Sequence, residues 1–413
     1  MSTDPSSPEA AGMSSARLER IRPVMESYVR ERGVAGISTM VSRRGRIVHT
    51  AQFGYQDKEA GTPMAADTIF RIYSMTKPIV STALMLLHEE GRFQLEHPVA
   101  QYLPAFATTK VLAADGALVD QARPMQVREL LMHTSGLTYD FMADNPVAQL
   151  YRDARIMNDA TRTLAALVDD LAALPLAFQP GTRWHYSVGI DVAARLIEVL
   201  AGQSVGDFLQ ERLFDPLGMV DTGFAVPADQ LHRLSAMYGL PDLIGENYSA
   251  IQLVEAALAG FNERLDVSAT YPTDTPHVFQ RGGVGLFSTA ADYMRFGQML
   301  AAGGTLDGVR VVGRKTLELM HANHLPVGLL PYELMGLPNP GMGFGLGSRV
   351  MLDVAATAGP GSAGEYGWAG AAKTYYWVDP AEELVGLFMS QNMTGVQLAE
   401  RDFRSLVYQA IDD

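Results

Sequence analysis

The chain has 413 residues, of which 47% are hydrophobic and 19% charged, which is enough for two or three domains with packed cores. Its 32 basic and 46 acidic side chains give a formal net charge of −14, which argues against binding to nucleic acid or to an anionic membrane surface. The absence of cysteine excludes disulfides, cysteine-ligated zinc, iron–sulfur clusters and a thiol nucleophile.

The N-terminal segment is polar and rich in small residues, without the basic-then-apolar order of a signal peptide. No segment supplies the roughly 18 consecutive apolar residues that a membrane-spanning helix needs. We therefore expect a cytoplasmic protein whose residues 1–13 are flexible.

Apolar residues recur at helical spacing over residues 18–29 and predict the first helix. The strand-like segments 37–41 and 47–51 then flank Gly45, a pattern typical of a β-hairpin. The stretch 238–277 is rich in proline and aspartate. It is either part of a substrate-binding rim or an ordinary surface excursion.

The C-terminal part has the same character as the start of the chain. Residues 396–411 look helical, and three segments look like strands: 344–354, 374–378 and 384–389. Strands at both ends predict one sheet built from the two termini. We expect an α/β domain from residues 1–97 and 281–413, with residues 98–280 inserted as a mostly helical domain.

Ser74 and Lys77 lie where an apolar helical run begins, because Pro78 is tolerated only in the first turn of a helix. Residues three apart share a helix face. The helix start favours a developing oxyanion and disfavours a protonated lysine, so Lys77 is placed to take a proton from Ser74. The alternative is that Ser74 only caps the helix and Lys77 is a solvated first-turn residue.

Two further motifs follow in a specific order. Tyr186-Ser187 comes after a Pro-Gly turn, and residues 367–372, which are mostly small, lead into a strand. In this order the motifs resemble those of the penicillin-recognising serine hydrolases, and the chain is similar to family VIII carboxylesterases and their class C β-lactamase relatives. The resemblance extends from about Leu18 to Val407 and includes the segments 70–72, 130–137, 180–182 and 282–289.

This resemblance implies an α+β fold of the β-lactamase/transpeptidase type, with an antiparallel sheet flanked by helices and an active site in the cleft beside the helical domain. It implies that Ser74 is the nucleophile, Lys77 its partner and Tyr186 the phenolic acid and base. The backbone N–H groups of Ser74 and Ala371 would form the oxyanion hole. No cofactor or metal is expected.

The chain departs from the β-lactamase pattern at two motifs. Val188 stands where β-lactamases have asparagine, and Trp368-Ala369-Gly370 stands where they have Lys-Thr-Gly. Because neither tryptophan nor alanine replaces the charge of that lysine, uncharged esters are favoured over β-lactams. Trp368, Gly370 and Tyr139 are candidates for the substrate pocket, although core packing is equally plausible for Trp368 and Tyr139.

We therefore expect a serine carboxylesterase that hydrolyses short-chain carboxylic esters through an acyl-enzyme, with a small-molecule ester as its partner. An acyltransferase, a β-lactamase and a D-amino-acid peptidase would use the same residues. A catalytically inactive binding protein on this fold is disfavoured, because it would have no need to keep Ser74, Lys77 and Tyr186 together.

Three other features are expected to be structural. Ser204 lies in a Gly-x-Ser-x-Gly pattern, but a helix rather than a strand precedes it, so it is expected to cap a helix. His133 is expected in a structural loop. His321 and His324 have no third ligand at metal-binding spacing.

Overall fold

The computed structural model describes residues 7–142, 145–157, 159–239, 263–274, 278, 280–393 and 398–413. Its centre is an 8-stranded antiparallel sheet in the order β14-β15-β16-β17-β18-β1-β2-β3. The strands are β1 (Gly36–Arg43), β2 (Arg46–Asp57), β3 (Thr62–Pro63), β14 (Met342–Phe344), β15 (Arg349–Met351), β16 (Tyr366–Gly370), β17 (Thr374–Asp379) and β18 (Leu384–Ser390).

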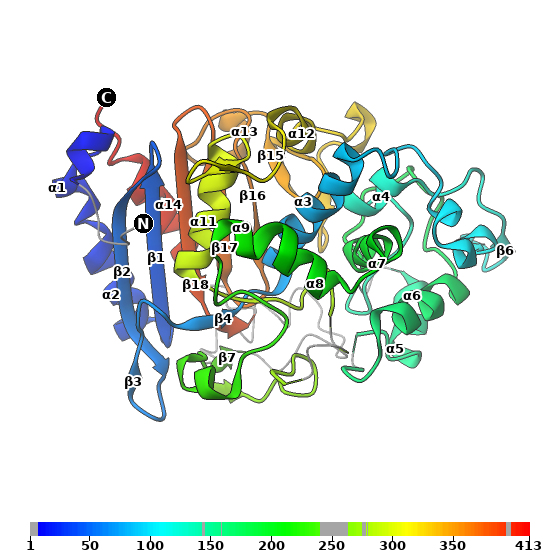
Figure 1. Cartoon of the computed structure of the whole chain (residues 1–413), viewed down its shortest axis with the longest axis horizontal. Helices are drawn as coiled ribbons and strands as arrows, with labels where there is room; N and C mark the ends of the chain where they lie inside the picture. The colour runs from blue at the N-terminus through cyan, green and yellow to red at the C-terminus, as the bar shows by residue number, and fades with distance from the viewer. Residues whose placement is uncertain are drawn as a thin grey trace.

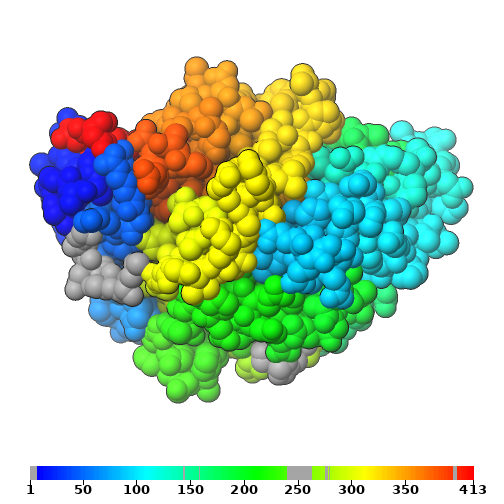
Figure 2. Space-filling view, turned by 45° about the horizontal axis from the view of Figure 1, so that its top comes forward, coloured from blue at the N-terminus to red at the C-terminus, as the bar shows by residue number. Residues whose placement is uncertain are grey.

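The two ends of the chain meet in the middle of this sheet. Strand β1 pairs with β18, with Ile37 opposite Ser390, and the expected sheet from both termini is confirmed. The expected hairpin is also present, because β1 and β2 are joined at Arg44 and Gly45, whose φ angles of 51° and 72° suit a tight turn. N-terminal blue and C-terminal red segments lie side by side in Figures 1 and 2.

Helices cover both faces of the sheet. Alternation along β17 and β18 sends Trp377 and Phe388 into one apolar cluster with α2 (Ile21–Glu31) and α14 (Ala399–Tyr408). Tyr376 and Leu387 point to the other face, into the cluster that includes α11 (Ala290–Ala301). The expected α+β fold, with helices flanking an antiparallel sheet, is confirmed.

Six helices from the middle of the chain gather on one side of the sheet (Figure 1). They are α4 (Val127–Leu131), α5 (Pro146–Asp153), α6 (Leu164–Ala173), α7 (Gly189–Ala201), α8 (Val205–Leu209) and α9 (Asp215–Leu217). Helix α3 (Thr76–Glu89) packs against α7 and joins this group to the sheet. No helix in the described ranges is long and apolar enough to cross a membrane. The domain boundaries at residues 97 and 280 stay a prediction.

Smaller elements complete the described structure. The short helices are α1 (Ser15–Leu18), α12 (Arg314–Met320) and α13 (Val354–Thr357). Short strands form β4 (Ile69–Arg71) with β9 (Phe287–Thr289), β5 (Val111–Leu112) with β6 (Leu118–Val119), β10 (Thr305–Leu306) with β11 (Val309–Arg310), β12 (Glu333–Leu334) with β13 (Leu337–Pro338), and β19 (Asn392–Met393) with β7 (Met237–Gly239) and β8 (Glu263–Leu265).

Two expectations about the ends of the chain need correction. A flexible start is wrong for residues 8–13, since Ala11 and Met13 are 0% and 1% exposed and Met13 bridges to Ile411. Residues 1–6 lie outside the described residues. The strand expected over 344–354 is two short strands followed by α13, because the chain turns at Gly347 (φ 94°), where a Cβ would lie 2.2 Å from the Ser81 hydroxyl.

The stretch 238–277, for which the sequence leaves a substrate-binding rim and a surface excursion open, falls largely outside the described residues. Two of its described segments, β7 and β8, pair with each other, and β7 also pairs with β19. The start of this stretch is therefore tied to the C-terminal part of the chain.

Candidate active site

Ser74 lies in the single 3₁₀ turn Tyr73–Met75, which leads directly into α3. Tyr73 has φ 44°, a left-handed conformation that a bulky side chain adopts only under strain. This sharp turn places Ser74 at the start of α3, where the backbone N–H groups of the first turn are not used within the helix. Pro78 is accommodated in that first turn, as the sequence predicts.

Lys77 is fully buried directly behind Ser74. Its Nζ donates to Ser74 Oγ at 3.0 Å and to the carbonyl oxygen of Gly283 at 2.8 Å. The same Nζ lies 5.3 Å and 4.7 Å from the ring centres of Tyr139 and Tyr186. The alternative of a solvated first-turn lysine is therefore wrong, since Lys77 is 0% exposed.

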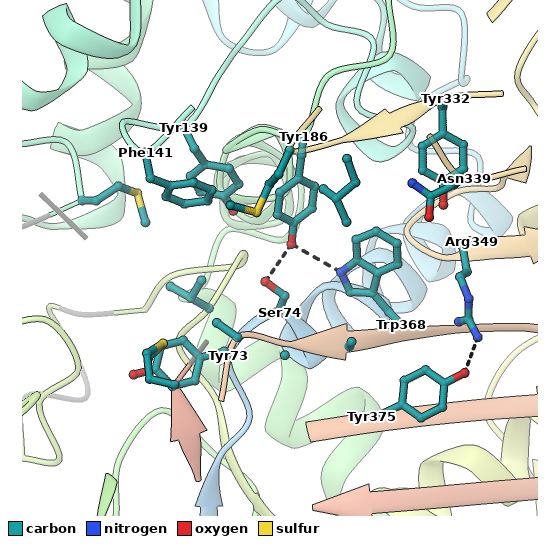
Figure 3. Close-up of a pocket in the computed structure, with 18 residues that line it drawn as sticks. Tyr73, Ser74, Tyr139, Phe141, Tyr186, Tyr332, Asn339, Arg349, Trp368 and Tyr375 are labelled. Atoms are coloured by element: carbon teal, nitrogen blue, oxygen red, sulfur yellow. Dashed lines mark hydrogen bonds between the residues drawn. The ribbon is translucent and has the colours of Figure 1, made fainter. Parts of the chain in front are cut away.

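Tyr186 approaches Ser74 from the opposite side to α3. Its hydroxyl donates to Ser74 Oγ at 2.7 Å and accepts from Trp368 Nε1 at 3.3 Å (Figure 3). Two donors thus converge on one serine oxygen, Lys77 from the start of α3 and Tyr186 from the loop before α7. This arrangement can move a proton to or from the Ser74 oxygen.

His133 supports the loop that carries Tyr186. Its backbone carbonyl accepts from the N–H of His185, and its Nδ1 lies 3.2 Å from Ser187 Oγ. The imidazole packs edge-on to the Tyr186 ring, with ring centres 4.8 Å apart. Burial lowers the pKa of His133 well below its usual range, so a neutral ring occupies this position.

Strand β16 forms the wall opposite the helical side. A Cβ on Gly370 would lie 2.4 Å from the carbonyl oxygen of Ile72, so glycine is needed for this strand to approach the Ser74 turn closely. Trp368 points from β16 towards Tyr186 (Figure 3). Ala371 follows β16 directly and lines the same cavity as Ser74.

These residues surround a cavity of about 340 Å³ with mostly aromatic and aliphatic walls. The structure brings six of the seven sequence-predicted site residues to its lining, and Lys77 lies behind it. Tyr139 stacks on Phe141 with ring centres 4.8 Å apart, and together they form one wall. The cavity is lined by Tyr73, Ser74, Tyr139, Phe141, Met157, Tyr186, Val284, Tyr332, Leu334, Met335, Asn339, Arg349, Trp368, Ala369, Gly370, Ala371, Tyr375 and Met393.

Sequence reasoning missed one wall of the cavity entirely. The β12–β13 hairpin contributes Leu334 and Met335, while Tyr332 directly precedes the hairpin and Asn339 follows it. Arg349, the first residue of β15, lines the cavity as well. The lining thus carries a positive charge at Arg349, away from the Trp368 motif where the sequence has none. Nothing in the local sequence distinguishes Arg349 from other strand residues.

Asp191, on α7, is a second residue that the sequence did not indicate. Its carboxylate is fully buried and accepts from the backbone N–H of Gly283 at 3.1 Å, while the carbonyl of Gly283 accepts from Lys77. A Cβ on Gly283 would lie 2.5 Å from Asp191 Oδ2 and 2.9 Å from the Tyr139 hydroxyl, so only glycine fits beside these two side chains. Burial raises the pKa of Asp191 above its usual value.

Ser204, His321 and His324, which are expected to be structural, do not line the cavity. Ser204 is the N-cap of α8 and accepts from the N–H of Asp207 at 3.1 Å, so the prediction that it caps a helix is confirmed. His321 and His324 each hydrogen-bond to a backbone carbonyl, at 2.9 Å and 2.8 Å. Burial lowers the pKa of His321 to about 3. No group of three metal-ligating side chains occurs in the described part of the chain.

Comparison with known proteins gives a consistent result. The family model described as Beta-lactamase matches residues 21–410. Esterase EstB from Burkholderia gladioli is 30% identical over 407 residues, which cover 96% of this chain and 97% of EstB.

Solved structures agree with this result. The structure described as EstCE1, a hydrolase with promiscuous acyltransferase activity, has a TM-score of 0.78 at 25% identity and covers 95% of this chain and 99% of its own. The crystal structure of a family VIII carboxylesterase has a TM-score of 0.71 at 21% identity, covering 97% of this chain and 99% of its own.

Proposed function

Because this chain belongs to the Beta-lactamase family and is a serine hydrolase of that family, we propose that it is a carboxylesterase acting through an acyl-enzyme on Ser74. The observation that carries the proposal is the convergence of Lys77 Nζ and the Tyr186 hydroxyl on Ser74 Oγ, at 3.0 Å and 2.7 Å. A serine attacks an ester only when a neighbouring group takes its proton, and both neighbours are within reach.

In the first step Ser74 Oγ attacks the ester carbonyl carbon, and its proton passes into the pair formed by Lys77 and Tyr186. The carbonyl oxygen becomes an alkoxide. We assign its stabilisation to hydrogen bonds from the backbone N–H groups of Ser74 and Ala371. The Ser74 N–H lies at the start of α3, where the helix dipole adds to this stabilisation. Removal of one such donor typically slows an enzyme by about 100-fold or more.

The intermediate then collapses, and Tyr186 protonates the departing alcohol oxygen. A water molecule attacks the acyl-enzyme, with Tyr186 taking its proton, and the acid is released as Ser74 regains its hydrogen. The Trp368 indole N–H, 3.3 Å from the Tyr186 oxygen, orients that hydroxyl throughout.

We propose a short, uncharged acyl group for the part of the ester next to Ser74. The nearest walls are Tyr139, Tyr186 and Trp368, which bury apolar atoms and contribute no formal charge. Gly370 lets β16 approach the Ser74 turn closely, which brings the Trp368 wall next to the nucleophile. A cavity of about 340 Å³ suits a small ester.

Acyl transfer to a second alcohol is the alternative that a specific observation favours. EstCE1, at 25% identity, is described as a hydrolase with promiscuous acyltransferase activity. The two reactions share the acyl-enzyme and differ only in whether water or an alcohol reaches it. The cytoplasmic location and the independence from cofactors stay predictions.

The test is a rate panel with wild type and Ser74→Ala over p-nitrophenyl esters, nitrocefin and a D-amino-acid amide. We expect p-nitrophenyl butyrate to have the highest kcat/KM, and Ser74→Ala to lose turnover of every substrate. Equal or higher efficiency on nitrocefin would replace the esterase assignment with a β-lactamase. Addition of an alcohol to the butyrate reaction, with the new ester measured by chromatography, quantifies acyl transfer in the same preparation.

A further inference from the structure

Arg349 is the only charged side chain among the described residues that line the cavity. Its side chain is 12% exposed. In Figure 3 it lies on the far side of Trp368 from Ser74, beside Asn339 and Tyr332. A guanidinium in an otherwise apolar cavity loses most of its hydration, so it needs partners that replace water.

The partners of Arg349 replace that water only in part. Its Nη2 donates to the Tyr375 hydroxyl at 2.6 Å, and Glu365 Oε1 lies 3.4 Å away, at the long end of the hydrogen-bonding range. Its Nη1 is buried and has no hydrogen-bond partner among the described residues. Because buried polar groups in native proteins are nearly always hydrogen-bonded, a donor left without a partner beside a cavity calls for an acceptor there.

The carboxylates near Arg349, those of Glu365 and Asp379, accept their short hydrogen bonds from other residues. Glu365 Oε1 accepts from Arg404 Nη1 at 2.5 Å, and its Oε2 accepts from the Tyr408 hydroxyl at 2.7 Å. Asp379 also accepts from Tyr408, at 2.8 Å, and not from either arginine. Two guanidinium groups therefore share the single carboxylate of Glu365, and the longer contact belongs to Arg349.

We propose that the Arg349 end of the cavity binds a carboxylate carried by the ester, on the part of the substrate that extends past Trp368. This proposal rests on the esterase function proposed above and specifies its substrate class. A carboxylate matches the planar donors of a guanidinium, and the side-chain amide of Asn339 lies on the same wall. Ser74 then acts on an uncharged ester carbonyl while Arg349 holds the charged end.

The experiment compares anionic esters with neutral esters of matched size. The pairs are 3-carboxyphenyl butyrate with 3-carbamoylphenyl butyrate, and 4-nitrophenyl hydrogen adipate with 4-nitrophenyl methyl adipate. These place the carboxylate on the alcohol side and on the acyl side. We expect the anionic member of at least one pair to have the higher kcat/KM, and Arg349→Gln to lower the anionic-to-neutral ratio by about 10-fold or more.

Two variants serve as controls. Arg349→Lys keeps the charge but loses the planar fork, and we expect a ratio between those of wild type and Arg349→Gln. Arg314→Gln removes the same charge from an arginine whose side chain is 63% exposed and outside the cavity lining, so the ratio should stay at the wild-type value. The proposal is wrong if Arg349→Gln leaves both anionic-to-neutral ratios unchanged. It is also wrong if Arg314→Gln lowers these ratios as much as Arg349→Gln does.

Binding separates this proposal from the esterase assignment. Ser74→Ala removes the nucleophile and keeps Arg349, so we expect it to bind 3-carboxyphenyl butyrate more tightly than the carbamoyl ester in calorimetry. Ser74→Ala with Arg349→Gln should lose that difference. Preferential binding without wild-type ester turnover would overturn only the esterase function. Turnover of neutral esters without preferential binding would overturn only the carboxylate site.

Discussion

A basic side chain is buried at each end of the cavity, Lys77 behind Ser74 and Arg349 past Trp368, and the two differ in their partners. At one end, Lys77 donates to Ser74 Oγ and to the Gly283 carbonyl and lies against two tyrosine rings. At the other end, Arg349 has one short hydrogen bond, one long contact with Glu365 and an unpartnered Nη1. Two hydrogen bonds hold Lys77 in place for chemistry, whereas Arg349 keeps one donor that no described residue accepts.

The difference also shows in how rigidly each end is built. The Ser74 end joins the start of α3, the loop before α7, the Gly283 loop and strand β16, through hydrogen bonds between residues far apart in the chain. The Arg349 end is covered by the two-residue strands of the β12–β13 hairpin. Substitutions at the two ends should therefore differ in their effects, strongest on kcat at the first and on substrate preference at the second.

The largest effect is expected at Ser74 itself. Ser74→Ala should lower ester turnover by about 10⁴-fold or more, because no other group can form the acyl-enzyme. A fluorophosphonate probe followed by mass spectrometry should label Ser74 in the wild-type protein. Ser204→Ala is the matched control and should retain turnover, since that serine caps α8. Labelling of Ser204 would overturn the assignment.

A smaller effect is expected at the two partners of Ser74. Lys77→Ala and Tyr186→Phe should each lower kcat by roughly 100-fold, the usual contribution of a positioned acid or base. Lys77→Arg should not restore the rate, because arginine does not give up its proton at working pH. Stopped-flow measurement of acylation would detect the loss directly. A well-folded Tyr186→Phe enzyme with a near-native kcat would show that the proposed proton path is wrong.

Asp191 should act as a positioning residue, with an intermediate effect. In Asp191→Asn an amide oxygen can still accept from the Gly283 N–H, but the bond to a charged acceptor is lost. We expect kcat to fall by about 10-fold with little change in KM, because Asp191 holds the loop behind Lys77 and does not line the cavity. Asp191→Ala should lower kcat further. An equal rise in KM for both variants would argue for general distortion of the cavity instead.

The smallest effect is expected from Trp368→Phe. This change keeps an aromatic wall and removes only the indole N–H that donates to Tyr186 at 3.3 Å. A neutral hydrogen bond of about 1 kcal/mol corresponds to roughly a 5-fold lower kcat. Steady-state kinetics on p-nitrophenyl butyrate would measure it. A loss as large as that of Tyr186→Phe would mean that Trp368 also contacts the reacting group.

The Ser74 end was predictable from the sequence and the Arg349 end was not. Ser74 and Lys77 are close in sequence, so helix geometry alone fixes their relation, and the order of the later motifs indicated Tyr186 and Trp368. Arg349 and Asp191 gain their surroundings from strand pairing and helix packing between distant segments. Alternation in a short strand such as β15 does not reveal which of its faces meets a cavity.

The pairing of Ile37 with Ser390 has a consequence for the order of events during synthesis. Strand β1 leaves the ribosome together with Ser74, well before its central partner β18. Until then β1 has an open edge, and the wall that carries Trp368 does not yet exist. Nascent chains that lack β18 therefore hold the nucleophile without a working pocket, and formation of the central sheet waits until β18 has been made. A stop codon before residue 384 would leave β1 without its central partner.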